Sequence, residues 1–383
     1  MTINLGVIGL GWFSNLNAQT VIERKDFNLK ISAACDIKKE KALAFGKKFN
    51  VKNIYQNPED LIKDKDVDIV IIATPPYLHA SIGKKALLEG KHVFFEKPGA
   101  LRPEQIQELI DIAKQNKLKT TIDYVMRRNP LYFIIKRLCD ENTFGPLERA
   151  ALENYAHDDH MPPHHWFWDY SKSGGIWVEH GVHFFDLVNW LIGPPDKVQA
   201  VNVRRKNHDL IDRITGLAIH NDDEIVNYYH GFTKPEPFEK TTFDFIFERA
   251  YAKVSGWIPE KLTIDCLVNS DIEAFVKGEV LRDSQNFLPE IDVLFSEKKI
   301  ELYKGNTFFA AKGKEFHATS RTIFEFTLKQ NRWDVYRTSV ITAVRDLADA
   351  VENKKQAPDV TLYDAKRALE IATGMEQNSI IIS

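Results

Sequence analysis

The sequence predicts an α/β protein with two domains, the first built on a parallel sheet and the second on a large open mixed or antiparallel sheet. Over residues 1–125, short apolar runs alternate with helical patterns, which is the signature of βαβ units. After Arg127, longer β-rich segments follow one another without intervening helices, as in a sheet that can offer one face to a partner. With 383 residues, 44% of them hydrophobic, the chain is long enough to form two cores.

In the first domain, strands are expected at 5–10, 30–35, 67–74, 92–96 and 119–124. The run VDIVIIAT at 67–74 is almost entirely apolar, as expected for a strand that is buried on both faces. Helices are expected after the first strand as far as Glu23, and at about 38–49, 77–88 and 103–116. Parallel strands arranged in this way bind ligands at their carboxyl ends.

In the second domain, strands are expected at 147–156, 198–206, 223–232, 241–248 and 250–257. Two helices, at about 339–353 and 362–377, complete the chain. We therefore expect a dinucleotide-binding first domain at 1–125 and a substrate-binding and oligomerisation domain at 126–383, whose terminal helices can pack back on the first domain.

Composition excludes several classes of protein. The formal net charge of -3 gives no basic face for nucleic acid. No apolar run approaches the roughly 18 residues of a membrane helix, and the first residues lack a signal-peptide pattern. The three scattered cysteines indicate a reducing compartment and exclude a thiolate zinc cage. The expectation is a cytoplasmic protein without a membrane or nucleic-acid partner.

The segment VIGLGWFS at 7–14 follows an apolar strand and precedes a helix. Gly9, Gly11 and Ser14 have the spacing G-x-G-x-x-G/A, with serine at the third place. Gly9 permits a tight turn, Gly11 lets a pyrophosphate approach the backbone, and the helix N-terminus offers free amides. Asp36 ends the second strand, where an acid hydrogen-bonds the adenosine ribose. This context predicts a Rossmann dinucleotide-binding domain.

Asp36 bears on which of the two nicotinamide cofactors the domain binds. Its carboxylate would repel a 2′-phosphate, so NAD is favoured over NADP. Lys38 and Lys39 lie nearby and keep NADP open as an alternative.

Two further loops come at later strand ends. In ATPPYLHA at 73–80, Thr74 can reach a phosphate or ribose while Pro75 stiffens the loop. In FFEKPG at 94–99, Glu96 and Lys97 end the next strand. A lysine there can point into the binding crevice, and an exposed surface position is the alternative.

Five motifs together resemble the glucose–fructose oxidoreductase/inositol dehydrogenase family, written Gfo/Idh/MocA. They are VIGLGWFS, CD at 35–36, ATPPYLHA, EKPGA at 96–100 and GGIWVEHGVHFFD at 174–186. The resemblance covers essentially the whole chain and implies an open sheet that often mediates dimers or tetramers. It also implies that Lys97 sits near the nicotinamide and substrate, with Pro98 after a cis bond. Glu179, His183 and Asp186 hold the places of the family's acid, histidine and aspartate, although that acid is typically aspartate.

The segment 174–192 can be one helix that begins at the glycines and ends at Gly193. On a regular helix Glu179, His183 and Asp186 share a face, and His180 points elsewhere. One interpretation is a core histidine held by carboxylates. A second is a metal site, since six of the twelve histidines lie within 157–183, but no ligand spacing such as H-E-x-x-H occurs and no metal is expected. The third is acid/base catalysis, which is favoured because oxidation of an alcohol needs a proton acceptor.

The segment 157–175 is expected to be an aromatic-rich loop next to the substrate. Trp166 and Trp168 offer faces for a sugar ring and His157 a partner for hydroxyls, while packing of at least one tryptophan in the core is also expected. Arg127 is a candidate substrate contact, with a solvent-exposed or inter-domain role as the alternative.

These features predict an NAD-dependent oxidoreductase that transfers hydride between the nicotinamide and a secondary hydroxyl or keto group of a sugar, cyclitol or glycoside. His183 takes the hydroxyl proton, Lys97 stabilises negative charge on the same oxygen, and Glu179 orients the substrate or His183. The expected substrate contacts are Asp186, His157, Trp166, Trp168 and Arg127. The expected cofactor contacts are Gly9, Gly11, Trp12, Phe13, Ser14, Asp36, Thr74, Pro75, His79, Glu96 and Lys97. Two alternatives stay open: a redox glycosidase that works through a keto-sugar intermediate, and a non-catalytic NAD or sugar sensor.

Overall fold

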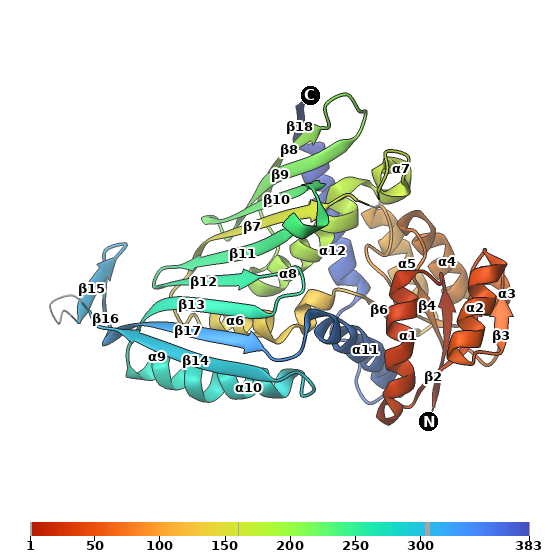
Figure 1. The fold of residues 1–383 in the computed structure, drawn as a ribbon, viewed down its shortest axis with the longest axis horizontal. Coiled ribbons are helices and arrows are strands. Elements are labelled where there is room, and N and C mark those ends of the chain that lie inside the picture. The colour runs from red at the N-terminus through yellow and green to blue at the C-terminus, as the bar shows by residue number, and fades with distance from the viewer. Residues whose placement is uncertain (1, 160, 303–306, 383) are drawn as a thin grey trace. The chain divides into compact units, whose positions relative to one another are not determined.

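A computed structural model describes residues 2–159, 161–302 and 307–382, which form two compact units (Figure 1). The first unit contains Met1–Val125, His164–Asp186 and Arg337–Thr373. The second contains Met126–Pro163, Leu187–Tyr336 and Gly374–Ser383. Each unit is thus assembled from separate stretches of chain. The division into continuous functional domains at 1–125 and 126–383 stays a prediction.

The first unit is built on a six-stranded parallel sheet with the strand order β3-β2-β1-β4-β5-β6. Its strands are β1 (Ile3–Ile8), β2 (Leu29–Cys35), β3 (Asn53–Tyr55), β4 (Ile69–Ile72), β5 (His92–Phe95) and β6 (Thr120–Ile122). Each pairs in parallel with its neighbours, and the order reverses between β1 and β4. This confirms the predicted Rossmann architecture, whose ligand crevice lies at such a reversal.

Five helices connect these strands: α1 (Trp12–Glu23), α2 (Lys39–Phe49), α3 (Pro58–Ile62), α4 (Pro76–Leu88) and α5 (Pro103–Gln115). Several strands end earlier than expected. The strand predicted at 67–74 ends at Ile72, and that predicted at 119–124 ends at Ile122. The residues beyond these ends are therefore loop residues at the carboxyl edge of the sheet, which is where a ligand-binding side chain is needed.

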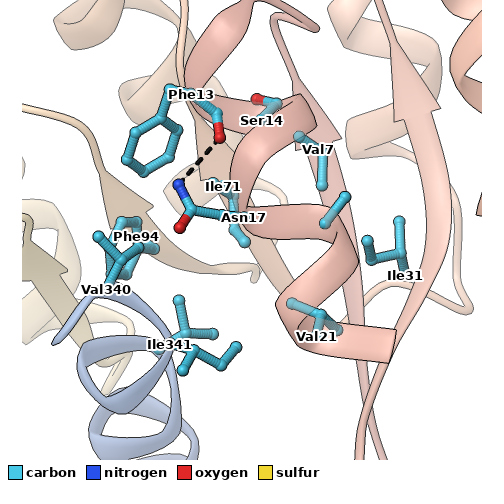
Figure 2. Close-up of a pocket in the computed structure, with 12 residues that line it drawn as sticks. Val7, Phe13, Ser14, Asn17, Val21, Ile31, Ile71, Phe94, Val340 and Ile341 are labelled. Atoms are coloured by element: carbon cyan, nitrogen blue, oxygen red, sulfur yellow. Dashed lines mark hydrogen bonds between the residues drawn. The ribbon is translucent and has the colours of Figure 1, made fainter. Parts of the chain in front are cut away.

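The helix α11 (Arg332–Val351) contributes side chains to the core of the first unit. Its Val340, Ile341 and Val344 line a small apolar cavity of about 30 Å³ together with residues of β1, β4 and α1 (Figure 2). The segment between α11 and α12 (Leu362–Gln377) is also fixed to β6, because Thr121 Oγ1 donates to the backbone carbonyl of Val360 at 2.7 Å.

The second unit is built on a ten-stranded sheet with the order β14-β17-β13-β12-β11-β7-β10-β9-β8-β18. The strands are β7 (Leu147–His157), β8 (Lys197–Arg204), β9 (Ile211–His220), β10 (Glu224–Lys234), β11 (Lys240–Phe247), β12 (Ala250–Ser255), β13 (Lys261–Val268), β14 (Val293–Ile300), β17 (Ser320–Leu328) and β18 (Ser379–Ile382). β7 pairs with β10, and β8 with β18, in parallel, while the other pairs are antiparallel. The predicted mixed sheet is confirmed.

Helices α6 (Pro130–Asp140), α9 (Ser270–Phe275) and α10 (Leu281–Phe287) accompany this sheet, and β15 (Phe308–Ala311) and β16 (Lys314–His317) form a separate hairpin. The rings of Phe133 on α6 and Phe287 on α10 stack with their centroids 4.2 Å apart. Within the described ranges, the structure holds no helix long and apolar enough to span a bilayer.

Candidate active site at the carboxyl edge of the parallel sheet

The carboxyl ends of five parallel strands bring a glycine turn and four polar residues to one edge of the first unit. Gly9 follows β1, Asp36 follows β2, Glu96 follows β5 and Asp123 follows β6, while Thr74 lies two residues beyond β4. Four of these positions were predicted from the motifs. Asp123 was not, although its place directly after the last parallel strand was a signal that could have found it.

The glycine turn has the geometry of a dinucleotide cradle. Gly9 has a φ of +92°, and a Cβ there would lie 2.4 Å from the carbonyl oxygen of Ala73, so only glycine fits. Around Gly11, a Cβ would meet no described atom within 4 Å, which leaves the backbone open to an incoming group. Ser14 is buried and donates its hydroxyl to the carbonyl of Gly9 at 2.6 Å. The serine at the third motif position thus stabilises the turn that it follows.

Asp36 is tied to this turn through both carboxylate oxygens. Oδ2 accepts a hydrogen bond from the Leu10 amide at 3.0 Å, and Oδ1 accepts one from the Lys38 amide at 2.9 Å. Each oxygen has a further lone pair for a ribose hydroxyl. Trp12, the first residue of α1, keeps 58% of its surface exposed. A glycine turn open at Gly11, beside a fixed acid, fits an adenine dinucleotide.

The loop after β4 is held in place by a hydrogen bond from the helix that follows it. His79 is 1% exposed, and its Nε2 donates to the Thr74 carbonyl at 2.6 Å. Burial lowers the pKa of His79 to about 4, so this ring is neutral near pH 7. The hydroxyl of Thr74 is buried and has no hydrogen-bond partner among the described residues. Pro75 precedes α4, and His79 acts here as support for Thr74.

Lys97 and Glu179 form the central ion pair of the site. Lys97 Nζ donates to Glu179 Oε1 at 2.7 Å and to the backbone carbonyl of Glu179 at 3.0 Å. Only 16% of the Lys97 side chain and 13% of the Glu179 side chain are exposed. The bond between Lys97 and Pro98 is cis, which confirms what the resemblance implied.

Burial and neighbouring charges set the protonation of Lys97 and of the adjacent Glu96. Burial alone would lower the pKa of Lys97, but the carboxylates of Glu179 and Glu96 outweigh it and the pKa is raised, so the ammonium persists. Burial also raises the pKa of Glu96 to about 8, with a further contribution from Asp123 and an opposing one from Lys97.

The segment that carries Glu179 departs from the regular helix that the spacing predicted. Gly174 has a φ of +76° and ends the short helix α7 (Tyr170–Ser173). A π-turn then spans Trp177–Gly181, and α8 (Val182–Ile192) follows. Such single π-turns occur often at functional sites.

His180 does not point away from the other site residues, as the regular helix had predicted. Its ring lies edge-on to that of His183, with the centroids 6.2 Å apart, because residues three apart on a helix are neighbours. Burial, with a smaller contribution from the charge of Lys97, lowers the pKa of His180 to about 3.

His183 and Asp186 are both deeply placed, with exposed fractions of 4% and 1%. The ring of Tyr124 lies edge-on to His183 at a centroid distance of 6.4 Å. Tyr124 is a second residue that the motifs did not identify as part of this cluster. Because Asp186 is almost completely buried, a role in supporting a neighbouring group is favoured over direct contact with a substrate.

The aromatic segment forms a 3₁₀ turn at Trp166–Trp168. Phe167 is the buried member, and its ring lies edge-on to Trp168 at 4.8 Å. Both tryptophans are half-buried and lie against Phe167, so each packs onto the core without being enclosed in it. In a turn of three residues the side chains point in three directions, and Phe167 takes the inward one.

Two predicted substrate contacts belong to the second unit. His157 is the last residue of β7, and Arg127 lies in a 3₁₀ turn at Val125–Arg128. Their roles stay predictions. His160, a member of the histidine-rich segment, lies outside the described residues. Across the described part of the chain, no group of three or more His, Cys, Asp or Glu residues could hold a metal ion.

Comparison with known proteins supports this picture. Residues 3–124 match the model of an oxidoreductase family with an NAD-binding Rossmann fold, and residues 133–251 match the GFO/IDH/MocA C-terminal domain. An uncharacterized oxidoreductase of Synechocystis sp. is 32% identical over 162 residues, which are 42% of this chain and 44% of that protein. The inositol 2-dehydrogenase of Rhizobium meliloti is 27% identical over 219 residues, 57% of this chain and 62% of that protein.

The alignments with these two relatives span 44% and 62% of their lengths. Among solved structures, a levoglucosan dehydrogenase in complex with NADH and levoglucosan superposes with a TM-score of 0.76 at 16% identity, covering 99% of this chain and 97% of the other. At that identity the likeness shows the fold. From the two family matches, we conclude that the chain belongs to the GFO/IDH/MocA family of oxidoreductases and that residues 3–124 are its NAD-binding Rossmann domain.

Proposed function

We propose that this protein is an NAD-dependent oxidoreductase that transfers hydride between the nicotinamide and a secondary hydroxyl or keto group of a sugar, cyclitol or glycoside. The observation that carries the proposal is the Lys97–Glu179 ion pair, which lies at the carboxyl edge of the dinucleotide-binding sheet, with Glu179 one helical turn before His183. The names of the relatives, an inositol dehydrogenase and a levoglucosan dehydrogenase, support a polyhydroxylated substrate and favour neither a redox glycosidase nor a sensor.

Lys97 is suited to stabilise charge on the reacting oxygen. An ammonium has three N–H donors, and among the contacts of the described residues Glu179 accepts from two of them. The third is available to a substrate hydroxyl, whose oxygen becomes negative as its proton leaves. A fixed donor in a site that is mostly shielded from water is effective at that task. Bound NAD supplies the hydride acceptor.

His183 is the proposed proton acceptor, and Asp186 one turn later is its proposed support. A neutral imidazole can take the hydroxyl proton, and a carboxylate beside the imidazole would stabilise the resulting cation. Tyr124 limits the positions of the His183 ring, because the two rings meet edge-on. Glu179 holds Lys97, so its part in the reaction is to keep the ammonium at the substrate oxygen.

The partly exposed tryptophans are the proposed contacts for the apolar face of a sugar ring. Trp166 and Trp168 flank the buried Phe167, so the core anchors the turn while the two indoles keep accessible surface. A polyol with several hydroxyls and an apolar C–H face matches such a lining.

A substrate panel tests the proposal. The full chain is incubated with NAD or NADP and with each member of a set of sugars, sugar acids, cyclitols and glycosides, and NADH or NADPH is followed by absorbance. We expect reduction of NAD with at least one polyol. Absence of turnover with the whole panel in both directions, from protein that binds NAD, would contradict the proposal.

We also propose that the protein is a cytoplasmic homodimer or homotetramer. The sheet of the second unit exposes large apolar side chains, including Ile225 at 43%, Tyr251 at 66% and Leu294 at 51%. Exposed apolar groups on a sheet face are typical of protein–protein contacts. Light scattering after size-exclusion chromatography measures the mass, and a monomer at micromolar concentration would contradict the oligomer.

A further inference from the structure

Glu96 lies beside a second acidic residue on the neighbouring strand. The Glu96 amide donates to the carbonyl of Ile72 at 2.9 Å, and the Asp123 amide donates to the carbonyl of Phe95 at 2.9 Å. Since Phe95 and Ile122 are register partners of parallel strands, Glu96 and Asp123 occupy equivalent positions one residue beyond them. Neighbouring strands are about 4.8 Å apart, so the two residues are adjacent at the edge of the sheet, and the charge of Asp123 acts on Glu96.

The ammonium of Lys97, whose charge favours ionisation of Glu96, is already engaged. Lys97 gives two hydrogen bonds to Glu179, whose carboxylate brings further negative charge to the cluster. A further titratable group near Glu96 is His79, which is buried and neutral near pH 7. The groups that act on Glu96 thus include two carboxylates and one ammonium that is shared with Glu179, and a neutral imidazole lies nearby.

Ionisation of Glu96 is unfavourable in such surroundings. Partial burial removes water from the carboxylate, and the like charges of Asp123 and Glu179 repel it. Burial first, and Asp123 second, raise the pKa of Glu96 to about 8, while the charge of Lys97 acts in the opposite direction. Near pH 7 the free protein therefore keeps a proton on this carboxyl group.

The position of Glu96 in the sheet matters for the cofactor. Asp36 follows β2, on one side of the Gly9 turn, and Glu96 follows β5, on the other. A dinucleotide spans the crevice across the strand-order reversal, so an adenosine held at Asp36 directs the nicotinamide toward β4, β5 and β6. The oxidised nicotinamide ring carries a positive charge, and the reduced ring is neutral.

We propose that Glu96 holds a proton in the free protein and releases it to solvent when NAD⁺ binds, so that the site binds NAD⁺ with proton release and NADH without it. The O–H bond of the Glu96 carboxyl group ionises, the proton goes to water, and no electron moves. This rests on the proposed function only in that NAD is the cofactor. Glu96 then distinguishes the two oxidation states by charge.

Proton release can be measured directly, without a substrate. The full chain at pH 7 in weak buffer with a pH-indicator dye is titrated with NAD⁺, and separately with NADH. We expect close to one proton per bound NAD⁺, because a carboxyl group with a pKa one unit above the pH is about 90% protonated. We expect almost none per bound NADH. Below the pKa of Glu96, NAD⁺ affinity should rise by up to about tenfold per pH unit.

Two variants identify the group. Glu96→Gln should bind NAD⁺ without proton release. Its affinity for NAD⁺ should also be constant between about pH 6 and about pH 9, because the carboxyl group whose ionisation is linked to binding has been removed. Glu89→Gln, an exposed glutamate at the end of α4, is the matched control and should behave as wild type. If circular dichroism shows that Glu96→Gln is unfolded, Asp123→Asn replaces it. Loss of the Asp123 charge should move half-maximal release to lower pH.

Each outcome of these titrations either supports or overturns proton release from Glu96. Release with NAD⁺ only, abolished in Glu96→Gln or moved to lower pH in Asp123→Asn, supports the inference. Binding of NAD⁺ without release, equal release with NADH, or unchanged release in the variant that folds would overturn it while leaving the proposed function intact. Failure of wild-type protein to bind NAD⁺ at all would overturn the cofactor assignment and the inference together.

Discussion

Lys97 donates to both the side-chain carboxylate and the backbone carbonyl of Glu179, at 2.7 and 3.0 Å, although the two residues are 82 positions apart in the chain. The π-turn at Trp177–Gly181 carries both acceptor atoms. Two acceptors fix the direction of the ammonium better than one, and they leave its third donor for a ligand. The two hydrogen bonds therefore fix the place at which the Lys97 ammonium can meet a substrate oxygen.

Replacing Lys97 with methionine should separate chemistry from cofactor binding. The Gly9–Ser14 turn and Asp36 are untouched, so the affinity for NADH, measured by calorimetry, should stay near the wild-type value. NADH is the ligand of choice because its binding does not depend on the ionisation of Glu96, which Lys97 favours. Loss of one donor to a developing oxyanion typically costs about 10²–10³-fold in kcat. Unchanged turnover would show that another group stabilises the oxygen.

Glu179 should act through Lys97 and not on the substrate directly. Glu179→Gln keeps the backbone carbonyl contact but removes the charge that raises the pKa of Lys97. The alkaline limb of the kcat profile should therefore move to lower pH, because Lys97 loses its proton more easily. Glu179→Asp keeps the charge and should restore the limb. A limb that is the same in all three proteins would contradict this role.

Asp36 should determine the choice of cofactor. Asp36→Ala removes the carboxylate that pairs with the ribose and repels a 2′-phosphate, so the ratio of NAD to NADP affinity should fall. The Leu10 and Lys38 amides lose their acceptor as well, and a modest loss of affinity for both cofactors is expected. Competition titrations measure both constants. A wild-type protein that already prefers NADP would contradict the ribose assignment.

Acid should weaken the anchoring of α11. Its Arg345 pairs with Glu352 and donates to the carbonyl of Phe27. Hydrogen bonding from Lys354, opposed by burial and aided by Arg345, lowers the pKa of Glu352 to about 2. A lowered carboxyl pKa stabilises the fold above the unfolded-state pKa, and this stabilisation is lost as the pH falls from about 4.5 toward 2.

Glu352→Gln should thus lower the free energy of unfolding by about 1 kcal/mol at pH 7 and by much less at pH 3, allowing for solvent screening. Urea unfolding at the two pH values tests this. An equal loss at both would mean that the ion pair does not contribute through its charge.

The sequence predicted most of the first unit because its strands are continuous apolar runs joined by helices of clear period. The edge strand β3 has only three residues, none of them fully buried, and left no such pattern. In the second unit β14 is mostly exposed and was equally hard to predict. β13 and β17 alternate between buried and accessible residues, which is the usual signal of a half-buried strand, so these two strands could have been predicted from the sequence.

The candidate site was predictable where motifs occupy strand ends, as for Gly9 and Lys97. It was not predictable where the answer depends on tertiary neighbours. Asp123 matters because it adjoins Glu96 across two strands, and Tyr124 because its ring meets His183. His180 lies next to His183, three residues further along, although the helical face drawn through Glu179, His183 and Asp186 did not include it.

The central claim, that Lys97 and His183 act on one substrate oxygen, is tested most directly by single-turnover hydride transfer with a polyol identified from the panel. NADH formation is followed by rapid mixing at saturating NAD in wild type, Lys97→Met, His183→Ala and the double variant. Loss of the general base should slow transfer about 10²–10⁴-fold and alter the acid limb of the rate profile. Because both groups serve the same oxygen, the double variant should lose less than the product of the two single losses. Near-wild-type transfer in His183→Ala, or strictly multiplicative losses, would contradict the account.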